Sequence, residues 1–219
     1  VLTKTSTALN GLSDANLLNV EAVTAASATA GVVIDLSRQT EKFSITGSAY
    51  ADTITGGSGG DVISAGAGND RIWNPVGVTS IDGGTGTDTI ALGSTSTSLN
   101  ALIDSKLVNV EAVDASSALA GVTLNLGSQT EGFQISGSAF ADTITGGFGV
   151  DNIVAGDGDD TILGVSGLDN IDGGAGRDTV QISATSLALN ALTDGQLKNV
   201  EVVSAATAAA GVTIDLSKQ

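Results

Sequence analysis

Aspartate recurs at every ninth residue in two stretches of this sequence, and glycine accompanies it. Written in nines, residues 47–91 and 137–181 form ten units, and the sixth position is aspartate in nine of them. Ca²⁺ takes about six to eight oxygen ligands from carboxylates and backbone carbonyls, which Asp- and Gly-rich turns supply together. Mg²⁺ fits this pattern less well, because it prefers octahedral shells that retain water. The residue types and their spacing therefore predict a series of Ca²⁺ sites.

Residues for other chemistry are missing from the sequence. The chain has no His and no Cys, which excludes an imidazole base, a thiol nucleophile and zinc–thiolate sites. It contains neither a Gly-x-Ser-x-Gly elbow nor a phosphate-binding glycine loop. A glycosidase-type carboxylate pair needs one acid whose pKa is raised in an apolar cleft, and the regular spacing singles out no aspartate for that role. We therefore expect no catalytic activity.

The negative charge of the chain limits the classes of partner that it can bind. Of 219 residues, 24 are acidic and 8 basic, so the net charge is −16, which disfavours nucleic acid and anionic membrane surfaces. The apolar runs are far shorter than the roughly 20 residues of a membrane-spanning helix, and the N-terminus has no signal-peptide pattern. Hydrophobic residues make up 41% of the chain, enough to fold once the acidic charge is balanced.

A second, longer period of 90 residues contains the first. Asn-Val-Glu occurs at 19–21, 109–111 and 199–201, and the segment that starts at Gly31 returns at Gly121. No capping sequence is evident, so we expect a fragment of a longer array or a unit that stacks on copies of itself. The predicted divisions are a partial repeat of β-rich spacer coils (1–46), a first nonapeptide block (47–91), further spacer coils (92–136), a second nonapeptide block (137–181) and a truncated spacer (182–219).

The ten tandem units resemble the RTX (repeats-in-toxin) nonapeptide G-G-x-G-x-D-x-U-x, in which U is large and aliphatic. Residues 56–64, GGSGGDVIS, are a clear copy, and the eighth position is aliphatic in all ten units. The resemblance covers 90 residues in the two blocks. It implies an all-β fold, a right-handed parallel β-roll or β-helix solenoid, with Ca²⁺ bound in its turns.

Each nonapeptide divides into a six-residue turn and a three-residue strand. The turn glycines, such as Gly56, Gly57 and Gly59, permit positive φ and let backbone carbonyls converge. The aliphatic residue of the strand points inward, since side chains alternate along a strand. Two nonapeptides make one coil of 18 residues, so units two apart stack about 4.8 Å from each other.

Stacking places the aspartates in columns, where carboxylates repel unless a cation lies between them. Five Ca²⁺ sites are predicted, at 52/70, 70/88, 142/160, 160/178 and 151/169, and a sixth at 61/79 is weakened by Thr79. The total is about five to six ions. The alternative, that Gly and Asp only form turns, does not explain the nine-residue spacing. The candidate ligands, by carboxylate or backbone carbonyl, are Asp52, Gly56, Gly57, Gly59, Asp61, Gly66, Gly68, Asp70, Gly83, Gly84, Gly86, Asp88, Asp142, Gly146, Gly147, Gly149, Asp151, Gly156, Gly158, Asp160, Gly164, Gly167, Asp169, Gly173, Gly174, Gly176 and Asp178.

The spacers carry a different pattern. Residues 20–23, 32–36 and 43–45 read as short strands, and apolar spacing predicts a short helix over 99–107. Since 90 residues equal five 18-residue coils, we favour one continuous solenoid over β-roll blocks joined by separate spacers. The residues of the Asn-Val-Glu motif and the Glu of Gln-Thr-Glu (Glu41 and Glu131) are interpreted as turn or ladder residues, with an extra Ca²⁺ or partner contact as the alternative.

The predicted function is a Ca²⁺-dependent extracellular structural module, in a surface layer, adhesin stalk or matrix filament. Its expected partners are copies of itself, end to end or side by side, neighbouring subunits or cell-surface polysaccharide. The resemblance implies secretion, through the type I route of Gram-negative bacteria. A second interpretation is the secretion and stability region of an enzyme or toxin whose active domain lies outside this chain. A third is an ice-binding face built on Thr53, Thr55, Thr143 and Thr145.

Overall fold

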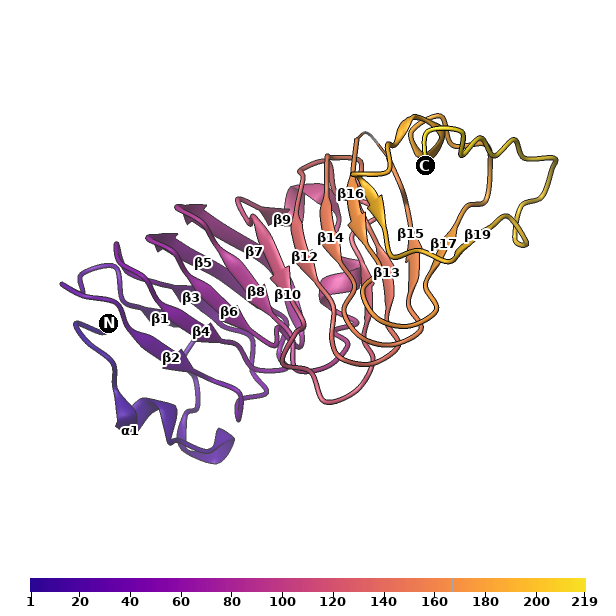
Figure 1. Ribbon diagram of the computed structural model, residues 1–219. Helices are drawn as coiled ribbons and strands as arrows, with labels where there is room; N and C mark the ends of the chain where they lie inside the picture. The colour runs from indigo at the N-terminus through magenta and orange to yellow at the C-terminus, as the bar shows by residue number, and fades with distance from the viewer. Residues whose placement is uncertain (167) are drawn as a thin grey trace. The chain divides into compact units, whose positions relative to one another are not determined.

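The computed structural model describes residues 1–166 and 168–219, which form two compact units. Unit 1 contains Val1–Ala91 and Ser96–Ala112, and unit 2 contains Leu92–Thr95 and Val113–Gln219. Each unit is a parallel β-solenoid of short strands (Figure 1). Among the described residues the α-helix is limited to the four-residue α1 (Thr7–Asn10). Gly167, a predicted ligand, lies outside the described residues.

Two parallel ladders make up unit 1. Strands that are two apart in sequence are neighbours in each ladder, as expected for a chain that visits two faces in turn. The first ladder runs β1 (Ala22–Thr24), β3 (Ser44–Thr46), β5 (Asp61–Ala67), β7 (Val78–Thr85) and β9 (Leu107–Val108), and the second contains β2 (Val33–Asp35), β4 (Thr53–Thr55), β6 (Arg71–Trp73) and β8 (Thr89–Ala91).

Unit 2 repeats this organisation with its own strands. One ladder runs β11 (Thr123–Asn125), β13 (Thr143–Thr145), β15 (Thr161–Leu163), β17 (Thr179–Gln181) and β19 (Val202–Ser204), and the other contains β12 (Gln134–Ser136), β14 (Asn152–Val154), β16 (Asn170–Asp172) and β18 (Leu197–Lys198). A further strand, β10 (Ala112–Asp114), lies where the two units meet in sequence.

The register within each ladder confirms the 18-residue coil of the nonapeptide blocks. Ile54 pairs with Ile72, and Ile72 pairs with Ile90, each 18 residues further on. Strands of the spacers join the same ladders at larger offsets. Ile45 follows its partner Val23 by 22 residues, and Leu107 follows Ile81 by 26.

Because spacer coils are longer, the 90-residue period holds fewer strands than the sequence predicts. Five 18-residue coils would give ten strands. From the start of β2 to the start of β11, which is one period, the chain forms nine. The spacers are therefore built into the ladders of each unit as enlarged coils.

The core of each unit is a row of aliphatic side chains contributed by the middle residue of each strand. Most three-residue strands bury the central side chain and leave its neighbours partly or fully exposed, so β4 buries Ile54 and β6 buries Ile72. Phe43 and Phe133, which precede β3 and β12, are also fully buried. One inward residue from each half-coil is enough because stacked coils cover it above and below, and β-branched Ile suits this pleated environment.

The helix predicted over 99–107 is wrong. The structure has two 3₁₀ turns, η2 (Leu99–Ala101) and η3 (Asp104–Lys106), followed by β9. Leu102, at φ −70° and ψ 131°, is extended and interrupts any longer helix. The apolar spacing arises because Leu99 and Leu107 each point into the core, while Ile103 is 58% exposed. Unit 2 has the equivalent turn η4 (Leu189–Ala191).

The Asn of the Asn-Val-Glu motif is a turn residue, as predicted. Asn19, Asn109 and Asn199 all adopt left-handed backbone, with φ between 49° and 56°. Asn109 Nδ2 also donates a hydrogen bond to Asp82 Oδ1 at 2.8 Å. Asn tolerates this conformation better than most residues because its short amide bonds locally.

We predict that Ile72→Ala destabilises the folded chain by about 2–5 kcal/mol, since it leaves a cavity between stacked coils. The control, Val33→Ala, removes a side chain that is 43% exposed on β2, in the same ladder, and should cost less than about 1 kcal/mol. Urea denaturation in saturating Ca²⁺ measures both free energies of unfolding. Equal losses would contradict the assignment of Ile72 to the core.

Candidate calcium-binding turns

The sixth-position aspartates of unit 1 lie in a buried column at one end of the strands. Asp52, Asp70 and Asp88 are each 3% exposed or less. The backbone N–H of Asp52 donates to Asp70 Oδ1 at 2.7 Å, and that of Asp70 donates to Asp88 Oδ1 at 2.8 Å. Each carboxylate is therefore bound by the coil that precedes it in sequence. The stacking agrees with the predicted columns, but the backbone N–H between neighbouring carboxylates was not foreseen.

Unit 2 forms the same column and a second one on its other flank. The N–H of Asp142 donates to Asp160 Oδ1 at 2.7 Å, and that of Asp160 to Asp178 Oδ1 at 2.9 Å. On the other flank the N–H of Asp151 donates to Asp169 Oδ1 at 2.9 Å. In unit 1, Asp61 stands alone on the corresponding flank and accepts the N–H of Phe43. Backbone hydrogen bonds to a carboxylate offset part of the free-energy cost of burying it.

Glutamates of the Asn-Val-Glu motif complete the main columns. Glu111 Oε2 accepts the N–H of Asp88 at 2.7 Å, and Glu201 Oε2 accepts that of Asp178 at 2.8 Å. This is the ladder role that the sequence predicts for the motif. The partner itself was missed, although the signal exists: each glutamate follows the last aspartate of its block by 23 residues.

Five of the nine carboxylates are closed, meaning that both oxygens accept backbone N–H groups. The second donor comes from the turn that contains the aspartate, at 2.5–2.9 Å. The closed carboxylates and these second donors are Asp52 with Ser48, Asp61 with Gly57, Asp142 with Ser138, Asp151 with Gly147, and Asp169 with Ser166. In these turns the backbone of the turn itself supplies the hydrogen bond that the second carboxylate oxygen needs.

The other four carboxylates are open. Asp70, Asp88, Asp160 and Asp178 each have a buried Oδ2 without a hydrogen-bond partner. An unpaired buried carboxylate oxygen is costly unless a cation is near. These four turns also contain paired left-handed glycines, which are Gly66 with Gly68, Gly84 with Gly86, Gly156 with Gly158, and Gly174 with Gly176.

The left-handed glycines explain why these turns are open. In four of the closed turns the second residue donates its N–H to the carboxylate of the same turn. In the open turns that residue is a glycine with φ between +94° and +115°. Stacked turns also approach closely, since a Cβ on Gly84 would overlap the carbonyl oxygen of Gly66. Glycine is required here both for conformation and for space.

The positive φ that glycine permits is not used at Gly56, Gly57 and Gly59, because none of the three is among the left-handed residues. They are needed for close approach instead. A Cβ on Gly57 would overlap the carbonyl oxygen of Gln39, and one on Gly59 would overlap that of Glu41. The neighbouring Gly60 is the left-handed residue, at φ 88°.

The open turns fit a hard cation. Within 1–166 and 168–219 no three acidic side chains group together as a metal site, so an ion there would draw most of its oxygens from the main chain. A Cβ on Gly83 would meet both the carbonyl oxygen of Asn109 and Asp88 Oδ2, and one on Gly173 would meet that of Asn199 and Asp178 Oδ2, so carbonyl oxygens lie near these two open carboxylates. Ca²⁺ accepts this mixture of few carboxylates and several carbonyls. When bound, it would supply positive charge to the unpaired Oδ2 atoms.

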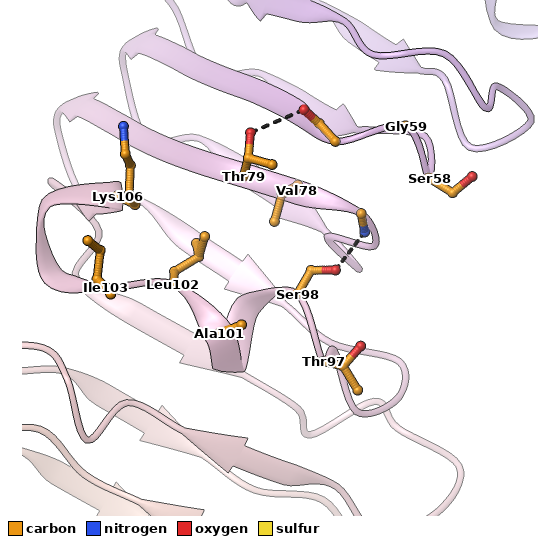
Figure 2. Close-up of a pocket in the computed structure, with 12 residues that line it drawn as sticks. Ser58, Gly59, Val78, Thr79, Thr97, Ser98, Ala101, Leu102, Ile103 and Lys106 are labelled. Carbon is orange, nitrogen blue, oxygen red and sulfur yellow. Dashed lines mark hydrogen bonds between the residues drawn. The ribbon is translucent and has the colours of Figure 1, made fainter.

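The weakened 61/79 position takes a different form. Thr79 Oγ1 donates to the carbonyl oxygen of Gly60 at 3.1 Å, and the N–H of Gly77 donates to Ser98 Oγ at 2.8 Å (Figure 2). A surface hollow of about 730 Å³ lies beside these residues. The hydroxyl of Thr79 also lies within hydrogen-bond distance of the carbonyl oxygen of Asp61. Since both carboxylate oxygens of Asp61 accept backbone N–H groups, the 61/79 position offers no unpaired carboxylate oxygen.

Burial raises the pKa of most of these carboxyls. It raises the pKa of Asp70, Asp160 and Asp169 to about 6, against the lowering effect of the backbone N–H bonds and with a further rise from neighbouring carboxylates. The pKa is raised for the same leading reason at Asp61, Asp88, Asp151 and Asp178. The metal-free columns therefore hold protons that free aspartates would have released.

Each unit is thus a parallel β-solenoid with stacked Gly-Asp turns. Comparison with protein-family models finds the RTX calcium-binding nonapeptide repeat in four copies, on residues 44–73, 134–162 and 163–181. The chain carries RTX calcium-binding repeats, as the resemblance implied, and repeats of this kind typically belong to secreted proteins. The matched residues of unit 1 end at Trp73, yet Asp88 beyond them has the same open geometry. Searches of curated proteins and of solved structures found no match.

The raised pKa values predict how the metal-free chain responds to pH. Between about pH 4 and 6 the folded chain binds protons that the unfolded chain, with a reference pKa of 3.8, has released. Stability without metal therefore falls as the pH rises through this window. In metal-free buffer, far-ultraviolet circular dichroism should therefore show more β-structure at pH 5.0 than at pH 7.5.

Saturating Ca²⁺ should reverse this order, because the ion requires ionised carboxylates. Metal-free β-structure that increases from pH 5.0 to 7.5 would contradict the protonated columns.

Proposed function

We propose that this chain is a structural repeat module that folds on Ca²⁺ outside the cell and serves a surface layer, an adhesin stalk or a matrix filament. The observation that carries the proposal is the set of four buried carboxylate oxygens without partners, at Asp70, Asp88, Asp160 and Asp178. They lie in turns whose glycines bring main-chain carbonyls close. A fold with this interior is complete only when cations are bound.

The five predicted sites can be ranked by the number of open carboxylates that each contains. Sites 70/88 and 160/178 each combine two open carboxylates, so we propose Ca²⁺ there first. Sites 52/70 and 142/160 each pair one open with one closed carboxylate. Site 151/169 pairs two closed carboxylates and has the weakest support. The expected filling therefore starts with one ion in each unit.

Calcium-dependent folding suits export through a narrow secretion apparatus. At a net charge of −16 the metal-free chain repels itself and is expanded. Cytosolic Ca²⁺ is low, so the chain would leave the cell unfolded, and Ca²⁺ outside would stabilise the folded state by mass action. Among the described residues no helix is long and apolar enough to cross a membrane.

We further propose that the chain has no catalytic activity of its own. The carboxyls with raised pKa are 0–2% exposed, so a substrate cannot reach them. A second candidate function is the RTX region of a secreted enzyme or toxin, which the family match supports equally. The parent polypeptide separates the two, because further 90-residue repeats favour the structural module, and an adjoining catalytic or pore-forming domain favours the second.

An ice-binding face has less support. Beside Thr53 on β4 the outward residues of adjacent strands are Val33 and Arg71, and beside Thr55 one of them is Asp35. In unit 2 the first residues of four adjacent strands form a regular row of threonines, which are Thr123, Thr143, Thr161 and Thr179. The third residues of the same strands form a mixed row, which contains Asn125, Thr145, Leu163 and Gln181. A flat array of paired threonines is therefore not formed.

The proposed function predicts a Ca²⁺-driven folding transition followed by assembly. Far-ultraviolet circular dichroism should show a largely disordered chain in EDTA and β-structure after addition of millimolar Ca²⁺. Electron microscopy of the Ca²⁺-loaded chain should then show filaments or sheets. A spectrum that Ca²⁺ does not change would defeat the folding mechanism, and dispersed monomers at high protein concentration would count against the structural role.

The ranking of sites predicts unequal effects of substitution within unit 2. Asp160→Asn removes an open carboxylate, so the Ca²⁺ concentration at the midpoint of folding should rise by about tenfold or more. Asp151→Asn, the matched control, changes a closed carboxylate and should shift that midpoint by less than about threefold. Titration of the circular dichroism signal with buffered Ca²⁺ measures both. Equal shifts would show that open and closed turns bind Ca²⁺ alike.

A further inference from the structure

A second group of unpaired acceptors lies outside the nonapeptide units, in the Gln-Thr-Glu turns of the spacers. These turns, at 39–41 and 129–131, precede the residues matched by the family model. Each lies against the first glycine turn of the adjacent block. The N–H of Ser58 donates to the carbonyl oxygen of Gln39 at 3.0 Å, and the N–H of Phe148 donates to that of Gln129 at 2.8 Å. The turn therefore joins spacer to block.

Buried side-chain oxygens in this turn have no hydrogen-bond partner. In unit 1 these are Gln39 Oε1 and Glu41 Oε2, and in unit 2 Glu131 Oε2 is in the same state. Gln39 is 2% exposed, and its Nε2 is engaged with the carbonyl oxygen of Leu12 at 2.9 Å. An unpaired buried amide oxygen and an unpaired buried carboxylate oxygen, on residues two apart in one turn, indicate a missing positive group.

A second carboxylate is held against the same turn. Asp14 Oδ1 accepts the N–H of Thr40 at 2.7 Å and its hydroxyl at 3.0 Å. These bonds lower the pKa of Asp14, and a side-chain hydrogen bond with Glu41 lowers it further. Two carboxyls within hydrogen-bond reach share either a proton or a cation.

Main-chain carbonyls complete the surroundings. Gly59 packs on the carbonyl groups of Thr40 and Glu41, where any Cβ would overlap them, and Gly149 packs in the same way on the carbonyl of Glu131. The turn and the adjoining Asp14 thus contribute two carboxylates, an amide oxygen and carbonyl oxygens to this part of unit 1. This oxygen-only donor set suits a hard divalent ion rather than a soft metal.

We infer that each Gln-Thr-Glu turn is a second class of Ca²⁺ site, separate from the nonapeptide turns. In unit 1 its candidate ligands are the carboxylates of Glu41 and Asp14, the amide oxygen of Gln39 and the neighbouring carbonyls. The inference rests on the proposed function only in that the same Ca²⁺-containing medium supplies the ion. Bound there, Ca²⁺ links the spacer to the first glycine turn of the block.

The test is the number of ions bound. Equilibrium dialysis against millimolar Ca²⁺, followed by metal analysis, should give two fewer ions per chain for the double variant Glu41→Gln, Glu131→Gln than for the unmodified chain. Glu21→Gln is the matched control, because Glu21 is exposed and should leave the number unchanged. Circular dichroism in Ca²⁺ confirms that each variant is folded.

If the double variant does not fold, the single variant Asp14→Asn decides the matter. Asp14 lies on the short η1 turn (Asp14–Asn16), outside the ladders, and its replacement should remove one ion. A full complement of ions in the folded double variant, or in Asp14→Asn, would overturn the inference while leaving the nonapeptide sites intact. Failure of the unmodified chain to bind any Ca²⁺ would instead defeat the proposed function and this inference together.

Discussion

The structure depends on a carboxylate buried between stacked coils. Each sixth-position aspartate accepts, through Oδ1, a backbone N–H from the coil before it, as Asp70 does from Asp52. Burying an ionised carboxylate is costly, and one hydrogen bond offsets only part of that cost. The remaining oxygen decides the character of the turn. Where a second N–H binds it the turn is complete, and where nothing binds it, as at Asp160, the protein requires a cation or a proton.

This distinction divides the chain into levels that need metal and levels that do not. The closed turns hold their carboxylates with donors such as Ser48 and Gly147. The open turns follow β5 and β14 and recur one coil later, so each unit contains two stacked open turns. The spacers add enlarged coils, a glutamate that ends each column and a second set of unpaired acceptors at Gln-Thr-Glu. Calcium, on the proposed function, therefore acts at specific levels of the solenoid rather than uniformly along it.

Much of this arrangement is readable from the nine-residue spacing. The period identifies the inward residues, such as Ile54 and Ile72, and shows which aspartates stack, because side-chain alternation and an 18-residue coil leave no other choice. The spacing does not predict which carboxylate oxygens accept a hydrogen bond from their own turn. GGSGGD at 56–61 matches the repeat best and yet is closed, whereas AGAGND at 65–70 is open. The difference lies in the φ angle of the second turn residue, and either turn offers glycine there. The 3₁₀ turns near Leu99 were mistaken for a helix because two short turns reproduce helical apolar spacing.

The direction of the hydrogen bonds between coils has a consequence for the order in which a chain assembles. For seven of the nine sixth-position aspartates the N–H donates to the acid of the coil that follows in sequence, which is Glu111 or Glu201 for the last aspartate of a block. The N–H of Asp61 instead donates to the carbonyl oxygen of Gly77. A coil without its successor in sequence therefore leaves the N–H of its aspartate without this acceptor, and it is completed only when that successor is added. Glu111 and Glu201 take the place of the successor, so each supplies the acceptor at the end of its column.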